Sequence, residues 1–192
     1  MGREFELKYA ATDVAQAAIR QCYGPWRQIC METTYYDTLD GALSQRRITL
    51  RLRKENEETV CTIKTPLPDG SRGEWECAAT NIEDGICRLT ALGAPEIIPQ
   101  LSNSGLVPRC GARFTRFAAE VPTADGTAEL ALDSGILLGG TQQMPLCEVE
   151  VELKSGSDAA AMALAADIAA KFGLTEESKS KFRRALALAQ GE

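Results

Sequence analysis

Segments in which charged and apolar residues alternate recur along this chain, and they restrict its fold more than any other feature. The segment nearest the start is Glu4-Phe5-Glu6-Leu7-Lys8. Because successive side chains of an extended strand point to opposite faces, Glu4, Glu6 and Lys8 share one face. Phe5 and Leu7 share the other face. One such strand is typical of any antiparallel sheet with its charges in water, so the argument depends on the recurrence of the pattern.

The alternation returns in four later segments, which are Arg51-Leu52-Arg53, Thr62-Ile63-Lys64, Glu74-Trp75-Glu76 and Glu148-Val149-Glu150-Val151-Glu152. The charged face is basic in the first two of these segments and acidic in the other two. Several strands with one charged and one apolar face favour a closed barrel. We therefore predict an α+β fold built on an antiparallel β-barrel of about eight strands.

Predicted helices indicate which way the charged faces point. Helical patterns follow Thr12-Asp13, cover about residues 81–92 and 95–101, run from Ser157-Asp158 to about Phe172, and occupy about residues 178–189. Their apolar stripes need an apolar surface to cover, which exists if the strands turn their apolar sides outward. The prediction is a tunnel with a charged interior and helices packed outside. Along one strand, a bend is expected at Ser134-Gly135.

A charged interior restricts what the tunnel can hold, because an unpaired buried charge costs several kcal/mol or more. Water, metal ions and a charged ligand in the lumen would make such an interior stable. Carboxylates bind hard cations such as Mg²⁺, whereas arginine grips phosphate oxygens in bidentate fashion and lysine acts as a point charge. A ligand that needs both kinds of side chain is a metal-bound polyphosphate.

The composition excludes several other kinds of protein. The 192 residues suit a single domain spanning residues 1–192, and the net charge of −6 argues against nucleic acid as a partner. The chain has no histidine, which removes Ser-His and Cys-His nucleophile pairs. Its seven cysteines form no Cys-x-x-Cys pair and are interpreted as reduced structural thiols of a cytoplasmic protein. No apolar run reaches about 18 residues, so no membrane partner is expected.

Taken in order, the motifs resemble those of the CYTH superfamily, the triphosphate tunnel metalloenzymes, and most of all its bacterial inorganic triphosphatases. The Glu-x-Glu-x-Lys signature stands here as Glu4 to Lys8. Later family elements correspond to Tyr35-Tyr36-Asp37-Thr38, Leu50 to Arg53, Thr62 to Lys64, Arg72-Gly73-Glu74-Trp75-Glu76, Arg113 to Arg116, Glu129 to Asp133, Glu148 to Glu152, and Ser178-Lys179-Ser180-Lys181. The resemblance covers nearly the whole chain, and the ordered set is more specific than any single motif.

The resemblance implies an eight-stranded tunnel that binds a triphosphate and a divalent metal, Mg²⁺ or Mn²⁺. It implies hydrolysis of inorganic triphosphate, or tripolyphosphate, to pyrophosphate and phosphate. By motif position, the phosphate-binding residues are Lys8, Arg51, Arg53, Lys64, Arg116 and Lys181. The metal ligands are Glu4, Glu6, Glu148 and Glu150, helped by Asp133 and Glu76. The residues expected to act in catalysis are Glu4, Glu6, Lys8, Glu150 and Lys181.

Other functions stay open at this point. Within the superfamily, the alternatives are a nucleoside or thiamine triphosphatase and an adenylyl cyclase. Cyclases often carry a histidine ahead of Glu-x-Glu-x-Lys, and its absence here disfavours that activity. A non-catalytic polyphosphate-binding module would not need the metal glutamates, so their presence favours an enzyme. Tyr35 and Tyr36 are expected to serve packing, Arg113 is expected to face away from Arg116, and a homodimer is left open.

Overall fold

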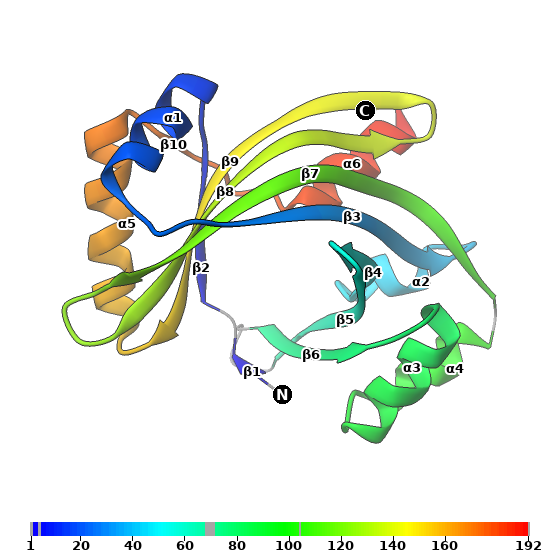
Figure 1. Cartoon of the computed structure of the whole chain (residues 1–192). Coiled ribbons are helices and arrows are strands. Elements are labelled where there is room, and N and C mark those ends of the chain that lie inside the picture. The colour runs from blue at the N-terminus through cyan, green and yellow to red at the C-terminus, as the bar shows by residue number, and fades with distance from the viewer. Residues whose placement is uncertain (1, 4, 68–71, 104, 192) are drawn as a thin grey trace.

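The computed structural model describes residues 2–3, 5–67, 72–103 and 105–191, and Figure 1 traces the chain. The strands are β1 (Gly2–Arg3), β2 (Glu6–Ala10), β3 (Arg27–Thr38), β4 (Thr49–Glu55), β5 (Glu58–Pro66), β6 (Arg72–Ala78), β7 (Leu106–Pro122), β8 (Thr127–Gly139), β9 (Gln142–Ser155) and β10 (Thr175–Glu176). The helices are α1 (Asp13–Cys22), α2 (Ala42–Gln45), α3 (Ile82–Ala91), α4 (Ile97–Ser102), α5 (Asp158–Phe172) and α6 (Lys181–Gln190). Each described helix is too short or too polar to cross a lipid bilayer.

All ten strands form one antiparallel sheet in the order β1-β6-β5-β4-β3-β7-β8-β9-β2-β10. The eight strands β2 to β9 have five residues or more, which confirms the predicted antiparallel α+β fold. The N-terminal segment meets both ends of the sheet, because β1 pairs with β6 while β2 pairs with β9. Between described residues, no ladder joins β6 directly to β9, so the sheet is strongly curved but not closed by hydrogen bonds.

The alternating strands turn their charged faces inward and their apolar faces outward, as predicted. On β9, Glu150 lines the central cavity, while Val149 and Val151 are fully buried on the opposite face. These valines belong to a core cluster with Ile19 of α1 and Ile168 of α5. Figure 1 shows α1 and α5 together on one side of β8 and β9. Burial of these apolar side chains holds the acidic strand in register with its charges facing the cavity.

A second core cluster covers the outer face of β4, β5 and β6. Leu50 and Ile63 from the strands are at most 1% exposed and pack with Leu89 of α3 and Ile98 of α4. In Figure 1 these two helices lie next to each other beside β6. The predicted helices at 81–92 and 95–101 therefore form, and they cover the strands that carry the basic segments.

Helix α6 differs from the others because it packs on the inner face of the sheet. Phe182 and Ala185 share a core cluster with Phe114 of β7 and Leu137 of β8, and Phe182 also lines the cavity. The rings of Phe182 and Tyr35 lie 5.1 Å apart, so Tyr35 serves packing as expected. The alternation along the strands does not predict that this helix packs on the inner face. The helix brings further charged residues to the interior.

The predicted bend at Ser134-Gly135 is wrong. β8 continues through both residues to Gly139, and the chain reverses at Gly140 and Thr141 instead. A Cβ atom at Gly135 would lie 2.2 Å from the backbone oxygen of Arg113 on β7. Glycine is needed here for a close approach between paired strands, a role that a sequence does not distinguish from a bend.

Replacing Gly139 with alanine should destabilise the protein, because its Cβ would lie 2.4 Å from the backbone oxygen of Ala185 in α6. Overpacking of this kind typically costs about 1–3 kcal/mol. Urea unfolding of Gly139→Ala is expected to show that loss. Ser134→Ala, on an exposed position of the same strand, should stay within about 0.5 kcal/mol of wild type. A Gly139→Ala protein as stable as wild type would contradict the inner packing of α6.

Candidate active site

The curved sheet encloses a cavity of about 800 Å³ that opens to solvent. Its charged lining comes from two groups of strands. One group, on β2, β7, β8 and β9 with α6, supplies Glu6, Lys8, Arg116, Glu129, Glu150, Glu152, Lys154 and Lys181. The other group, on β4, β5 and β6, supplies Arg51, Arg53, Glu55, Lys64, Arg72, Glu74 and Glu76. Each group therefore contains charges of both signs, which partly neutralise one another.

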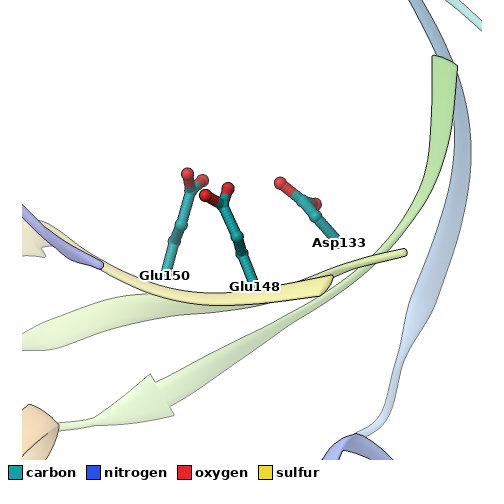
Figure 2. A group of neighbouring side chains, drawn as sticks. All are labelled: Asp133, Glu148 and Glu150. Carbon is teal, nitrogen blue, oxygen red and sulfur yellow. The ribbon is translucent and has the colours of Figure 1, made fainter. Parts of the chain in front are cut away.

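One of these lining residues, Glu150 of β9, belongs to a buried cluster of three carboxylates with Glu148 of the same strand and Asp133 of β8. Asp133 pairs directly with Glu148 across the ladder, and Glu150 follows two residues later on the same face. All three residues are buried, and each offers one oxygen within 4.8 Å of the others. Figure 2 shows the three side chains pointing away from the strands into the same space.

A buried glutamine behind the cluster helps to fix its backbone. The side-chain nitrogen of Gln16 on α1 donates to the carbonyl oxygens of Asp133, at 3.0 Å, and Glu148, at 2.8 Å. Gln16 is itself 8% exposed. Helix α1 therefore holds the ladder from outside at the residues that carry the inner carboxylates.

Lys181 lies at the centre of the three carboxylates. Its Nζ atom is 2.8 Å from Asp133 Oδ2, 2.6 Å from Glu148 Oε2 and 2.5 Å from Glu150 Oε1. Lys181 is the first residue of α6, and Ser180 caps the helix by accepting from the backbone N–H of Arg183. The inner packing of α6 thus directs its first side chain into the acidic cluster.

Arg116 of β7 contacts the same cluster from another side. Its guanidinium donates to both oxygens of Asp133, each at 2.7 Å, and also to Glu150. Arg116 and Asp133 are direct partners in the β7–β8 ladder, which explains the two-pronged geometry. The structure therefore places Arg116 against carboxylates, whereas the resemblance assigned it to phosphate.

Arg184 is a residue of this site that the sequence analysis did not select. Its guanidinium pairs with Glu148 Oε1 and lies 3.6 Å from Glu177 Oε2. Residues three apart on a helix share a face, so the position of Arg184 after Lys181 was the available signal. Glu148 is consequently held by α6 at both oxygens, by Lys181 on one and by Arg184 on the other.

Opposite charges within the cluster shift the pKa values of its buried ionisable groups. Burial alone would raise the pKa of Glu150, but attraction by Lys181 and Arg116 outweighs burial and holds this pKa well below its ordinary value. Burial would lower the pKa of Lys181, but attraction by Asp133 and the two glutamates raises it well above its ordinary value. Both groups are therefore charged at neutral pH.

The basic strands carry ion pairs of different lengths. Lys64 Nζ lies 3.5 Å from Glu74 Oε1, and the nearest nitrogen of Arg51 lies 3.9 Å from the same oxygen. Arg53 donates to Glu55 at 2.6 Å and lies 3.8 Å from Glu76. Lys64 and Arg51 therefore meet Glu74 at longer range, whereas Glu55 holds Arg53 closely.

The remaining predicted residues lie apart from the buried cluster. Glu6 lines the cavity, lies 3.7 Å from Lys8 and faces Glu152 across the β2–β9 ladder. Glu76 is on β6, where it accepts from Thr62 at 2.9 Å and is not part of the three-carboxylate group. Arg113 pairs with exposed Glu32 on the outer face, as its position relative to Arg116 predicts. Glu4 lies outside the described residues.

Stability at acid pH should depend on Glu150. Its depressed pKa contributes stability that is complete above the unfolded value of about 4.5 and is lost as the pH falls below it. In the presence of a chelator, the free energy of unfolding should therefore fall between about pH 5 and 3, by up to about 1.4 kcal/mol per pH unit for this group. Urea titrations of Glu150→Gln should show a shallower dependence, while Glu32→Gln, an exposed control, should keep the wild-type slope.

Comparison with known proteins gives the family of the chain. The model of the CYTH domain family matches residues 2–186. A curated inorganic triphosphatase of Haemophilus influenzae is 29% identical over 164 residues, which are 82% of this chain and 47% of that protein. The chain thus spans about half the length of that relative.

Solved structures share the fold along nearly the whole chain. A Bacillus halodurans protein described as a candidate adenylate cyclase has a TM-score of 0.67 at 22% identity, with 96% of this chain and 98% of that chain covered. A Hippeastrum protein described as a candidate adenylyl cyclase with dominant triphosphatase activity has a TM-score of 0.66 at 18% identity, with coverages of 98% and 96%. These likenesses concern the fold alone. The family match over residues 2–186 shows that the chain belongs to the CYTH domain family.

Proposed function

We propose that the protein hydrolyses inorganic triphosphate to pyrophosphate and phosphate with the help of a divalent cation, Mg²⁺ or Mn²⁺. The observation that carries this proposal is the cavity that Glu150, a member of the buried carboxylate cluster, lines together with Arg51, Arg53 and Lys64. A metal-bound triphosphate presents a cation to the carboxylates and phosphate oxygens to the bases. The inorganic triphosphatase of Haemophilus influenzae, as a family relative, supports the choice of substrate.

The carboxylate cluster fits a divalent cation. Mg²⁺ and Mn²⁺ favour oxygen ligands, and the three side chains Asp133, Glu148 and Glu150 each offer one oxygen within 4.8 Å of the others. Glu6 lines the same cavity from the neighbouring strand β2 and is available as a further oxygen ligand. A bound cation would neutralise phosphate charge and lower the pKa of an attacking water.

The basic side chains bind and orient the phosphates. The guanidinium groups of Arg51 and Arg53 suit bidentate contacts with phosphate oxygens, and Lys64 supplies a point charge one strand away. These cations stabilise charge on the transferring phosphoryl group and on the leaving pyrophosphate. Removal of one such contact in an enzyme typically lowers the rate by about 100- to 1,000-fold.

Glu150 orients a water molecule rather than removing its proton. A carboxylate whose pKa lies far below its ordinary value is a weak base at neutral pH. Its oxygens nevertheless accept hydrogen bonds, and Glu150 lines the cavity beside Lys8, its partner across the β2–β9 ladder. A cation held by the carboxylates would supply the lowered pKa of the attacking water, while Glu150 would orient that water.

The test compares phosphate release from tripolyphosphate, ATP and thiamine triphosphate, with Mg²⁺ and with Mn²⁺. We expect tripolyphosphate to be turned over fastest. Glu6→Gln should lose about 100-fold or more of the rate while remaining folded, and Glu32→Gln, an exposed glutamate outside the cavity, should retain it. Faster turnover of ATP with a cyclic product would identify a cyclase, and tight binding without turnover would identify a binding module. Either result would overturn the proposal.

Lys64 offers a separate test of the phosphate-binding group. Lys64→Ala should weaken binding of tripolyphosphate by about tenfold or more, because a partly buried ammonium is lost from the cavity. Lys54→Ala removes an exposed lysine from the adjacent strand and should leave the affinity unchanged. Calorimetric titration of both variants makes the comparison, with thermal unfolding to verify their folds. Equal affinities for the two variants would remove Lys64 from the phosphate-binding group.

A further inference from the structure

Lys181 occupies the position that a metal ion would need. Its ammonium nitrogen lies 2.5–2.8 Å from one oxygen of each of the three clustered carboxylates. Oxygen ligands lie about 2.0–2.6 Å from a bound Mg²⁺ or Ca²⁺. A cation coordinated by Asp133, Glu148 and Glu150 would therefore fall almost on the nitrogen of Lys181, and the two cannot be there together.

The charge balance of the cluster also argues against binding of a metal ion beside Lys181. Three carboxylates contact three cations, Lys181, Arg116 and Arg184, and Glu177 and Glu129 lie 3.6 Å from Arg184 and 3.9 Å from Arg116, so positive charge does not exceed negative charge here. Adding a divalent cation without losing another positive charge would leave a buried excess of positive charge, which is unfavourable. Departure of one cationic side chain when a metal binds reduces this added positive charge.

Lys181 is the side chain best placed to leave. Arg116 is fixed by two hydrogen bonds to its ladder partner Asp133. Arg184 approaches Glu148 from its other oxygen, Oε1, and pairs with Glu177 as well. Lys181 instead sits among the ligand oxygens, begins a helix, lines the cavity and has a flexible four-carbon stem.

We propose that Lys181 is a built-in counter-ion that leaves the carboxylates when a divalent cation binds and then turns to the phosphates in the cavity. This inference deepens the proposed function and rests on its metal site. Before metal binds, Lys181 neutralises the acids and is held away from the substrate. After metal binds, the same ammonium becomes available to an anion, so the affinities for metal and triphosphate rise together.

The proposal predicts the sign of an effect on metal binding alone. Lys181→Met removes the competing charge, so the variant should bind Mn²⁺ at least about tenfold more tightly than wild type without any substrate. Lys179→Met removes an exposed lysine two residues earlier and should leave Mn²⁺ affinity unchanged. Isothermal titration of the three proteins with Mn²⁺ measures this directly. Unchanged or weaker binding by Lys181→Met would overturn the proposal.

Two further variants keep the test decisive. In Lys181→Met combined with Glu148→Gln, the gain in Mn²⁺ affinity should disappear, which locates it in the cluster. Lys181→Arg keeps the positive charge and should bind Mn²⁺ no more tightly than wild type. If Lys181→Met is only marginally stable without metal, the rise in its melting temperature on adding Mn²⁺ should exceed that of wild type, and a smaller rise would contradict the proposal.

The Mn²⁺-binding test of Lys181 and the hydrolysis test of the proposed function can fail independently of each other. Tighter Mn²⁺ binding by Lys181→Met, with no hydrolysis of tripolyphosphate by the wild type, would support the counter-ion and reject the triphosphatase. Hydrolysis by the wild type, with no gain in Mn²⁺ affinity in the variant, would reject the counter-ion and leave the triphosphatase standing.

Discussion

The buried ion cluster of Asp133, Glu148, Glu150 and Lys181 is the interaction on which the rest of the structure depends. Three carboxylates at this depth would repel one another strongly without cations, because water does not screen them there. The sheet supplies Arg116 and the helix α6 supplies Lys181 and Arg184. The acidic wall and the C-terminal helix therefore stabilise each other, and the inner position of α6 follows from this charge balance as much as from its apolar contacts.

Two layers of packing fix the positions of the side chains in the cluster. Outside the sheet, Ile19 and Ile168 pack against the valines of β9. The side chain of Gln16 donates hydrogen bonds to the backbone carbonyl groups of Asp133 and Glu148. Inside, Phe182 packs beside Tyr35 and Phe114 and directs the start of α6. The contrast with the basic strands is informative. There Lys64 lies 3.5 Å from Glu74 while Arg53 donates to Glu55 at 2.6 Å, so the basic strands combine a longer and a closer ion pair.

Local sequence patterns predict some parts of the fold and the candidate site and not others. The period of two along β9 places Glu148 and Glu150 on one face, and the same parity separates Arg113 from Arg116. Parity does not say which strands become neighbours, so it could not separate Glu76, which faces Thr62 and Arg53, from the carboxylates of β8 and β9. The role of Arg184 depends on helix α6 entering the cavity, which no local pattern encodes. Gly135 likewise permits a close approach of strands, although its sequence context suggests a bend.

The pairing of β2 with β9 has a consequence for how the protein folds. Lys8 and Glu150 are partners across this ladder, although most of the chain separates them in sequence. Contacts between residues so far apart require closure of a long loop, which is entropically unfavourable and slow. The β4–β5 and β8–β9 hairpins can form from neighbouring residues, whereas the wall that joins β2 to β9 must wait for both ends of the chain. The contact that brings Lys8 beside Glu150 is therefore expected to form after the hairpin that carries the three carboxylates.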